Sequence, residues 1–398
     1  MAFIYSIKDT YRAAVEAATG GKNTVIYDDK VNPSIMVAIP KFKIKDVIDG
    51  GSDKVHPAFI VNGVEKDAIY IGKYQACVTD GRAYSLPGQD PKASINFDTA
   101  LNYCYAKGPG WHLMSNAEYA AIALWCKKNG YMPRGNNNYG CDISAAHEKG
   151  RATHYNTPST GQIGRCATGS GPASWSHDGT PDGIYDLNGN VWEWTSGMRL
   201  NNGEIQVIQD NNAAILNADH SANSQLWKAI LQDGSLVAPG TLNTLKFDGD
   251  RVVSSPSNNV GGNVGQPILN ITRENPSHTP DVNDYYQEVS RTFESLTAKS
   301  GVESPEILKA LALFPIDAQC GGDMLYVRNY GERLPIRGGS FASSAAAGVF
   351  ACNLNNQRTN SNTNIGFRAA LLSWQEVISS RAYIQAERCK GVYSHTIR

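Results

Sequence analysis

The sequence predicts an α+β fold made of short strands, a few short helices and long loops. Glycine and asparagine account for 38 and 33 of the 398 residues, and both residue types tolerate the positive φ angles found in turns. The apolar runs are short and strand-like, as in Ile35–Pro40, and helical spacing is confined to a few segments with capping signals. Hydrophobic residues still make up 41% of the chain, so we expect a sizeable core.

The N-terminal region contains the first predicted elements. A short helix is expected around Thr10–Ala18, and compact structure is expected to begin near residue 35 with a buried strand. Two further strands, at His56–Asn62 and Ala68–Tyr74, flank the dipeptide Asn62-Gly63, which is a hairpin-type turn signal.

Two helices should follow these strands. Phe97–Cys104 has apolar residues at helical spacing. Ser115 and Glu118 form an S-x-x-E capping box ahead of a second helix at Tyr119–Cys126. Asn129-Gly130 then favours the end of that helix, because both residue types accept the conformation of a helix C-terminus.

The remaining elements are less sharply delimited. Residues 131–176 should form long loops that pack on a core, and residues 201–270 should be rich in strands and turns. Helical patterns occur over residues 281–299, from Ser304-Pro305 to about Phe314, and after a second capping box at Ser373 and Glu376.

The charge balance argues against two classes of protein. Lys and Arg number 36 against 37 Asp and Glu, so a basic groove for nucleic acid is not expected. No apolar run reaches the roughly eighteen residues that a membrane-spanning helix needs. The first 30 residues are charged throughout and lack the apolar segment of a signal peptide. We therefore expect synthesis in the cytoplasm, no nucleic-acid partner and no membrane insertion.

The eight cysteines suggest neither a metal clip nor a disulfide framework. No two of them are closer than fifteen residues, so there is no CxxC pair. Their share of this long chain is too small for a disulfide scaffold. Free thiols are expected.

Three motifs occur in order along the chain. Gly183–Trp194 reads GIYDLNGNVWEW, Arg337–Phe341 reads RGGSF, and Ile365–Arg368 reads IGFR. Together they closely resemble the formylglycine-generating enzyme, or sulfatase-modifying factor, family. The resemblance implies that family's variant of the C-type lectin fold. The expected organisation is an N-terminal segment at 1–34, a lectin-type domain at 35–371 with an insertion at about 200–330, and a helical tail at 372–398.

The first motif has a structural interpretation and a metal-binding one. Trp192 and Trp194 alternate as strand residues that bury large rings, and this structural role is favoured. Asn190 and Glu193 are weak candidates for a structural calcium ion, which members of the family can bind, because one carboxylate with amide oxygens is compatible with a hard cation without being specific for one. His112 and His177 are interpreted as structural, since neither is paired with a recognisable nucleophile. No cofactor is otherwise required.

The resemblance also bears on catalysis. Formylglycine-generating enzymes carry two redox cysteines shortly after the RGGS-type motif, and these thiolates bind copper and handle oxygen. Aligned from Arg337, the two positions fall on Ser343 and Gly348. Neither residue is a soft ligand for copper, and Cys352 alone cannot replace a pair. Activity of the family type is therefore not expected.

Residues 337–371 form an Asn- and Ala-rich cassette between two of the family motifs. Six asparagines fall within twelve residues there. The cassette resembles the variable region of proteins diversified by retroelements, in which miscopied adenines change AAC codons for Asn into codons for other residues. The alternative is an ordinary low-complexity surface loop. In the variable-region interpretation, three segments would anchor the backbone: Arg337-Gly-Gly, Val349-Phe350 and Ile365–Arg368. The residues between these segments would bind a ligand.

These observations lead to a hypothesis for function. The chain is expected to be a non-enzymatic receptor-binding protein with a hypervariable face, as in a phage tail, located in the virion rather than on a bacterial surface. Its partners would be a host cell-surface protein or glycan and other virion proteins, with homo-oligomerisation left open. The alternatives are an oxidase of the sulfatase-modifying type and a structural virion protein. The residues expected to contact the ligand are Ser340, Phe341, Ala342, Ser343, Ala346, Cys352, Asn353, Asn355, Asn360 and Asn362.

Overall fold

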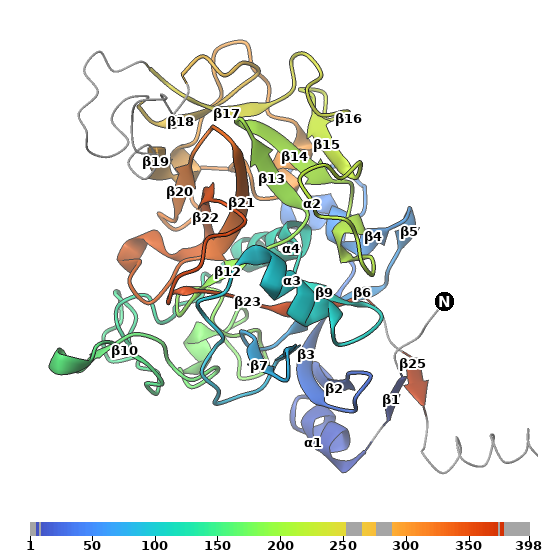
Figure 1. Ribbon diagram of the computed structural model, residues 1–398, viewed down its shortest axis with the longest axis vertical. Coiled ribbons are helices and arrows are strands. Elements are labelled where there is room, and N and C mark those ends of the chain that lie inside the picture. Colours follow the sequence, from blue (N-terminus) through green and yellow to red (C-terminus); the bar gives the residue numbers. More distant parts are fainter. Residues whose placement is uncertain (1–4, 8, 252–264, 276–288, 373–374, 378–398) are drawn as a thin grey trace, which may run out of the picture.

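Two sheets of unequal size pack around one central helix, α4 (Asn116–Lys128) (Figure 1). The computed structural model describes residues 5–7, 9–251, 265–275, 289–372 and 375–377. Residues of both sheets join α4 in the largest buried hydrophobic cluster. Every residue of α4 from Asn116 to Leu124 is buried, as expected for a helix that is covered on all sides. The predicted α+β class is therefore confirmed.

The smaller sheet has five strands in the order β2-β3-β6-β24-β9. All of its neighbouring strands are antiparallel. Four of its five strands lie within the first 113 residues. The remaining strand, β24, comes from the C-terminal end of the cassette at residues 337–371. The strands are β2 (Asn23–Tyr27), β3 (Pro33–Pro40), β6 (Ala68–Gly72), β24 (Ala369–Leu371) and β9 (Trp111–Leu113).

The larger sheet has twelve strands within the described ranges. Its main path runs β16-β15-β14-β13-β21-β22-β20-β19, and β12, β23, β17 and β18 branch from it. The main-path strands are β16 (Leu236–Val237), β15 (Trp227–Ile230), β14 (Glu204–Ile208), β13 (Met198–Asn201), β21 (Glu332–Gly338), β22 (Gly348–Asn356), β20 (Met324–Val327) and β19 (Val289–Thr292). The branch strands are β12 (Trp192–Trp194), β23 (Ile365–Phe367), β17 (Lys246–Gly249) and β18 (Pro267–Asn270).

Eight short strands form separate two-stranded pairs. They are β1 (Tyr5–Ile7) with β25 (Gln375–Val377), β4 (Ile60–Val61) with β5 (Val64–Glu65), β7 (Cys77–Thr79) with β8 (Arg82–Tyr84), and β10 (Tyr155–Thr157) with β11 (Gln162–Ile163). The β10–β11 hairpin belongs to the long loop region and projects from the body of the molecule (Figure 1).

The helices agree well with the capping signals. The helix α1 (Thr10–Ala18) has the predicted bounds, and α3 (Phe97–Tyr105) follows Asn96, whose side chain accepts from the Thr99 N–H. The capping box of Ser115 and Glu118 is formed at the start of α4. Two shorter helices are α2 (Ile44–Val47) and α5 (Glu306–Ala310), and α5 lies inside the helix predicted from Ser304-Pro305. No helix in the described part of the chain is both long and apolar enough to span a bilayer.

Sheet structure begins before the expected boundary at residue 35. The strand β2 pairs with β3 residue by residue, from Asn23 opposite Val37 to Tyr27 opposite Pro33. All five β2 residues are at least nine-tenths buried. Residues 23–27 are therefore part of the smaller sheet, although they precede residue 35.

Three other local predictions need correction. His56–Phe59 is not a strand, because Pro57 starts a short 3-10 helix that the His56 side chain caps, and the Asn62-Gly63 turn joins β4 to β5. Of the helix predicted over 281–299, residues 281–288 lie outside the described residues, and the next four form β19, which pairs with β20. The predicted C-terminal helix also lies outside them, except that Gln375–Val377 is the strand β25.

Candidate ligand-binding face

The cassette 337–371 is part of the framework as well as of the surface. Its strand β22 lies between β21, which is antiparallel to it, and β20, which is parallel. Val349 and Phe350 at its start are each 1% exposed, and Phe350 stacks on Phe293. The predicted anchors in the middle of the cassette are therefore confirmed as core residues.

The end of the cassette joins the two sheets. The strand β23 pairs with β12, with Gly366 opposite Glu193, and β24 follows at once between β6 and β9. Arg368 lies between these two strands and is completely buried. Its guanidinium donates to both Glu193 oxygens, at 2.6 and 2.9 Å, and to backbone carbonyls. The IGFR motif thus marks the junction of the sheets.

Four of the predicted ligand-contacting residues surround one hollow. Asn353, Asn355, Asn360 and Asn362 line a depression of about 340 Å³, which is at the small end of the range for ligand pockets. Three of its six other lining residues are also polar and uncharged. The complete lining adds Arg328, Ile336, Asn356, Ser361, Asn364 and Ile365.

Hydrogen bonds between amide side chains hold part of this hollow in place. The Asn356 amide donates to Asn353 Oδ1 at 3.1 Å, and the Asn360 amide donates to Asn356 Oδ1 at 3.1 Å. Asn360 and Asn362 are nevertheless exposed. The hollow therefore presents mainly neutral hydrogen-bonding groups, with one cationic side chain, Arg328, in its lining. The neutral groups can bind hydroxyls, amides and peptide backbone without a charge requirement.

The other predicted contacts lie on the turn between β21 and β22. Ala342 is exposed, and Ser343 and Ala346 are half-buried around a 3-10 turn at Ser344–Ala346. This turn is connected to the hollow, because the Asn364 amide donates to Ser340 Oγ at 3.2 Å. A hydrogen bond therefore links the turn to the lining of the hollow.

Four predicted contact residues are buried, and their assignment to the exposed face is corrected. Asn355 borders the hollow but is only 8% exposed. Cys352 is completely buried in the middle of β22, where it lies opposite Arg337 on one side and Leu325 on the other. Phe341 is 2% exposed because its ring lies against Tyr139 and His154, with centroid separations of 6.0 and 6.5 Å. Ser340 is 1% exposed.

One functional contributor was missed by the sequence analysis. Arg358 holds the base of the loop that carries Asn360 and Asn362. Its guanidinium contacts Glu332 at 3.2 Å, Asp98 at 2.7 Å and the His220 carbonyl at 2.6 Å. A signal was available, because Arg358 is the only charged residue between Arg337 and Arg368.

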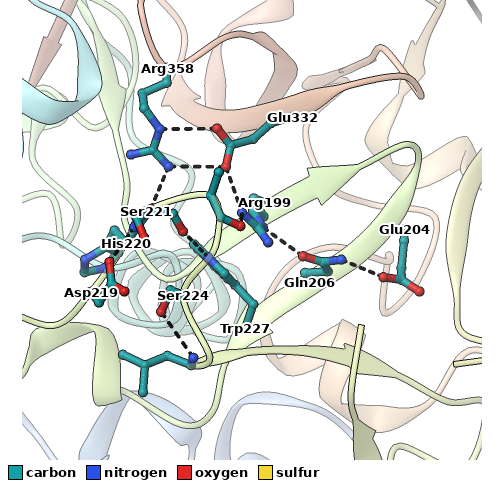
Figure 2. Close-up of polar contacts among 12 residues, drawn as sticks. Arg199, Glu204, Gln206, Asp219, His220, Ser221, Ser224, Trp227, Glu332 and Arg358 are labelled. Atoms are coloured by element: carbon teal, nitrogen blue, oxygen red, sulfur yellow. Dashed lines mark hydrogen bonds and ion pairs between the residues drawn. The ribbon is translucent and has the colours of Figure 1, made fainter. Parts of the chain in front are cut away.

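The contacts of Arg358 continue into the strands of the insertion (Figure 2). Glu332 also accepts from Arg199 at 2.8 Å, and Arg199 donates to Gln206 Oε1 at 2.8 Å. Gln206 in turn donates to Glu204 at 2.6 Å. This chain of alternating donors and acceptors crosses from the cassette to β13 and β14, so the loop is attached to the larger sheet.

Loops outside the cassette extend the face. The Ser344 N–H donates to the Asn137 carbonyl at 2.8 Å, and the Tyr139 N–H donates to the Phe341 carbonyl at 2.7 Å. Two large apolar side chains in the same loop region are exposed, Ile143 by 45% and Tyr155 by 49%. Exposed aromatic and aliphatic side chains of this kind are common in protein-recognition surfaces.

The positions aligned with the redox cysteines hold groups of different chemistry. Ser343 Oγ accepts from the Ser340 N–H at 2.9 Å. At Gly348 a Cβ atom would lie 2.0 Å from Asp323 Oδ1, so the buried Asp323 carboxyl fills the space that a side chain there would need. Burial raises the pKa of the Cys352 thiol, although Arg337 opposes the shift. A buried thiol of this kind is a poor source of thiolate.

His112 and His177 both have structural partners. His112 is completely buried with Nε2 2.9 Å from Glu118 Oε1. His177 Nδ1 accepts from the Ile184 N–H at 2.9 Å, and burial lowers the pKa of His177 to about 4. Both rings connect elements of the core.

The donors at the suggested calcium site are already engaged. Asn190 Oδ1 accepts from the Cys166 N–H at 2.8 Å and from Asn136 at 3.1 Å, while its amide nitrogen donates to Gln75 at 3.0 Å. Glu193 is paired with Arg368. Within the described residues no group of three or more His, Cys, Asp or Glu side chains is arranged to bind a metal ion. Asn190 and Glu193 as they stand do not fit a calcium site.

Comparison with known protein families gives a match. The sulfatase-modifying factor enzyme 1-like domain matches residues 15–229, which is more than half of the chain. The matched segment contains α4 and the Gly183–Trp194 motif and ends before the cassette. No curated protein matches the chain.

Proposed function

Because the chain belongs to the sulfatase-modifying factor enzyme 1-like domain family, we propose that it uses a C-type lectin-like scaffold of this family to bind a ligand rather than to oxidise a cysteine. The binding face consists of the turn at residues 342–346 and the hollow lined by Asn353, Asn355, Asn360 and Asn362. Their gathering around one hollow is the observation that carries the proposal.

The chemistry of the face supports binding to varied ligands. Ala342, Asn360 and Asn362 are exposed on segments whose backbone is held by other residues. Substitution at these positions would change the hydrogen-bonding surface without removing core contacts. A scaffold that tolerates such changes suits a face diversified by a retroelement, which samples many side chains at fixed positions.

The environment of the aligned redox positions argues against oxidase activity. A hydroxyl and a glycine cannot form the two-thiolate site for copper, and the Asp323 carboxyl fills the space beside Gly348. Incubation of the purified protein with copper, oxygen and a cysteine-containing sulfatase peptide should leave the peptide unchanged. Formation of formylglycine would favour the oxidase.

The biological setting that fits best is a phage tail protein that contacts a host cell-surface protein or glycan and is attached to other virion proteins. The DNA beside the gene tests the diversification. It should contain a reverse transcriptase and a near-copy of the cassette that differs at adenines, above all in the codons of the exposed positions. Absence of both would reject diversification.

A structural virion protein is the remaining alternative. It predicts that the exposed cassette residues do not affect attachment. Virions that carry Asn360→Ala and Asn362→Ala together should adsorb to host cells less well than virions with the wild-type protein. Unchanged adsorption by correctly assembled virions would favour the structural role.

A further inference from the structure

Four buried oxygens converge on one nitrogen, that of the Gln75 side-chain amide. Gln75 Nε2 lies 3.1 Å from the carbonyl oxygen of Asp186, 3.3 Å from that of Gly189, 2.9 Å from that of Val191 and 3.1 Å from Glu193 Oε1. Gln75 has no exposed surface, and Glu193 is 1% exposed. An amide nitrogen carries two hydrogens, so it cannot donate a full hydrogen bond to each of four oxygens.

The orientation of the Gln75 amide follows from its neighbours. The Cys166 backbone N–H can only donate, so its partner at 2.8 Å must be the oxygen of Asn190. The other Asn190 atom is therefore the NH₂ group, and it donates to Gln75 at 3.0 Å. The Gln75 atom that receives this bond must be its oxygen, which places the Gln75 NH₂ group among the four oxygens.

A cluster of three carbonyls and one carboxylate around a single point is the donor set typical of a hard cation such as calcium. The distances of 2.9–3.3 Å here are those of N–H···O hydrogen bonds, whereas calcium–oxygen distances are about 2.3–2.6 Å. The Glu193 charge is also balanced by Arg368, whose Nη2 and Nε lie 2.6 and 2.9 Å from its oxygens. The oxygens therefore already have an amide donor and a guanidinium partner.

We propose that the Gln75 amide takes the position of a structural cation and, with Arg368, holds the loop at residues 186–191 and the strand β12 without a metal. The stability of the fold is then independent of calcium. The same geometry makes the site latent. Replacing the Gln75 amide by a carboxylate removes the N–H donors from the centre of the cluster and adds an oxygen and a second negative charge, so a cation drawn between the carboxylates and the carbonyls would find the kind of ligands that calcium binds.

The test compares wild type with Gln75→Glu as full-length proteins. Thermal unfolding is measured in EDTA and in excess calcium, and terbium luminescence is excited through Trp192 and Trp194, which flank Glu193. Wild type should unfold at the same temperature in both solutions and give no sensitised emission. Gln75→Glu should unfold at a lower temperature in EDTA, recover stepwise as calcium is raised, and sensitise terbium.

Gln89→Glu provides a matched control, because Gln89 is exposed and the same change there adds only surface charge. It should show no calcium response. A wild-type unfolding temperature that falls in EDTA, or sensitised terbium emission from wild type, would overturn the proposal even if Gln75→Glu failed to fold. A folded Gln75→Glu protein with no calcium response would also overturn it.

Discussion

Replacing Arg358 by alanine should loosen the loop that carries the exposed asparagines. The variant loses two ion pairs, to Glu332 and Asp98, and a hydrogen bond from the guanidinium to the His220 carbonyl. It also loses the position of the guanidinium 5.3 Å from the Phe97 ring centroid.

These contacts do not contribute equally to the free energy of unfolding. The Asp98 side chain is 51% exposed, so that pair contributes about 0.5 kcal/mol or less. Glu332 keeps its partner Arg199 at 2.8 Å and is not left unpaired. The charged hydrogen bond to the carbonyl contributes about 1.5 kcal/mol, and the ring contact about 0.5 kcal/mol. The Glu332 pair contributes about 0.5 kcal/mol. Together these terms predict that Arg358→Ala lowers the free energy of unfolding by roughly 3 kcal/mol.

Urea unfolding followed by tryptophan fluorescence measures this loss, and hydrogen exchange of residues 357–364 locates it. Gln357→Ala is the control, because the adjacent Gln357 side chain is exposed. The control should change the free energy of unfolding by less than about 0.5 kcal/mol. If Arg358→Ala cost no more than the control, the reasoning about how the loop is held would be refuted.

Three further predictions concern other parts of the molecule. Asn360→Tyr should leave the free energy of unfolding within about 0.5 kcal/mol of wild type. Cys352→Tyr should lower it by about 3 kcal/mol or prevent folding, because the larger side chain overfills the core. Equal effects of the two substitutions in urea unfolding would contradict the division into face and core. Gly348→Ala should cost about 1–3 kcal/mol through the clash with Asp323, and an unchanged unfolding midpoint would argue against the observed proximity. Burial lowers the pKa of His220 to about 4 from 6.5, so the unfolded chain binds more protons between these values and stability should fall as the pH drops from 6.5 towards 4. His220→Phe should make the unfolding free energy less dependent on pH in that window, and an unchanged slope would contradict this.

The parts of the fold that sequence predicts well are those set by local contacts. The helix α4 starts at the expected capping box because Ser115 and Glu118 satisfy each other's backbone groups within one turn. The helix α1 is likewise preceded by the side-chain cap of Asp9. The strand β19 was mistaken for part of a helix because its conformation depends on pairing with β20, which lies more than thirty residues away.

The residues of the candidate site also divide into those whose position the sequence predicts and those whose position depends on distant strand pairing. Asn353, Asn355, Asn360 and Asn362 could be selected from composition, and they do surround one hollow. The burial of Cys352 could not be predicted, because it depends on β20 and β21 pairing with both edges of β22. The β21–β22 ladder also contains two shifts of register, and these break the simple alternation from which exposure is inferred.

The central claim is that the exposed cassette residues can vary without cost to the scaffold and can bind a ligand. Two libraries of displayed full-length protein test it, one randomised at Ala342, Ser343, Asn360 and Asn362, the other at Val349, Phe350, Ile365 and Phe367. The folded fraction is measured by resistance to protease, and each library is then selected against a purified unrelated test protein. We predict that most members of the first library stay folded and that binders emerge from it, while most of the second unfold. Equal loss of folded protein in both libraries would contradict the account.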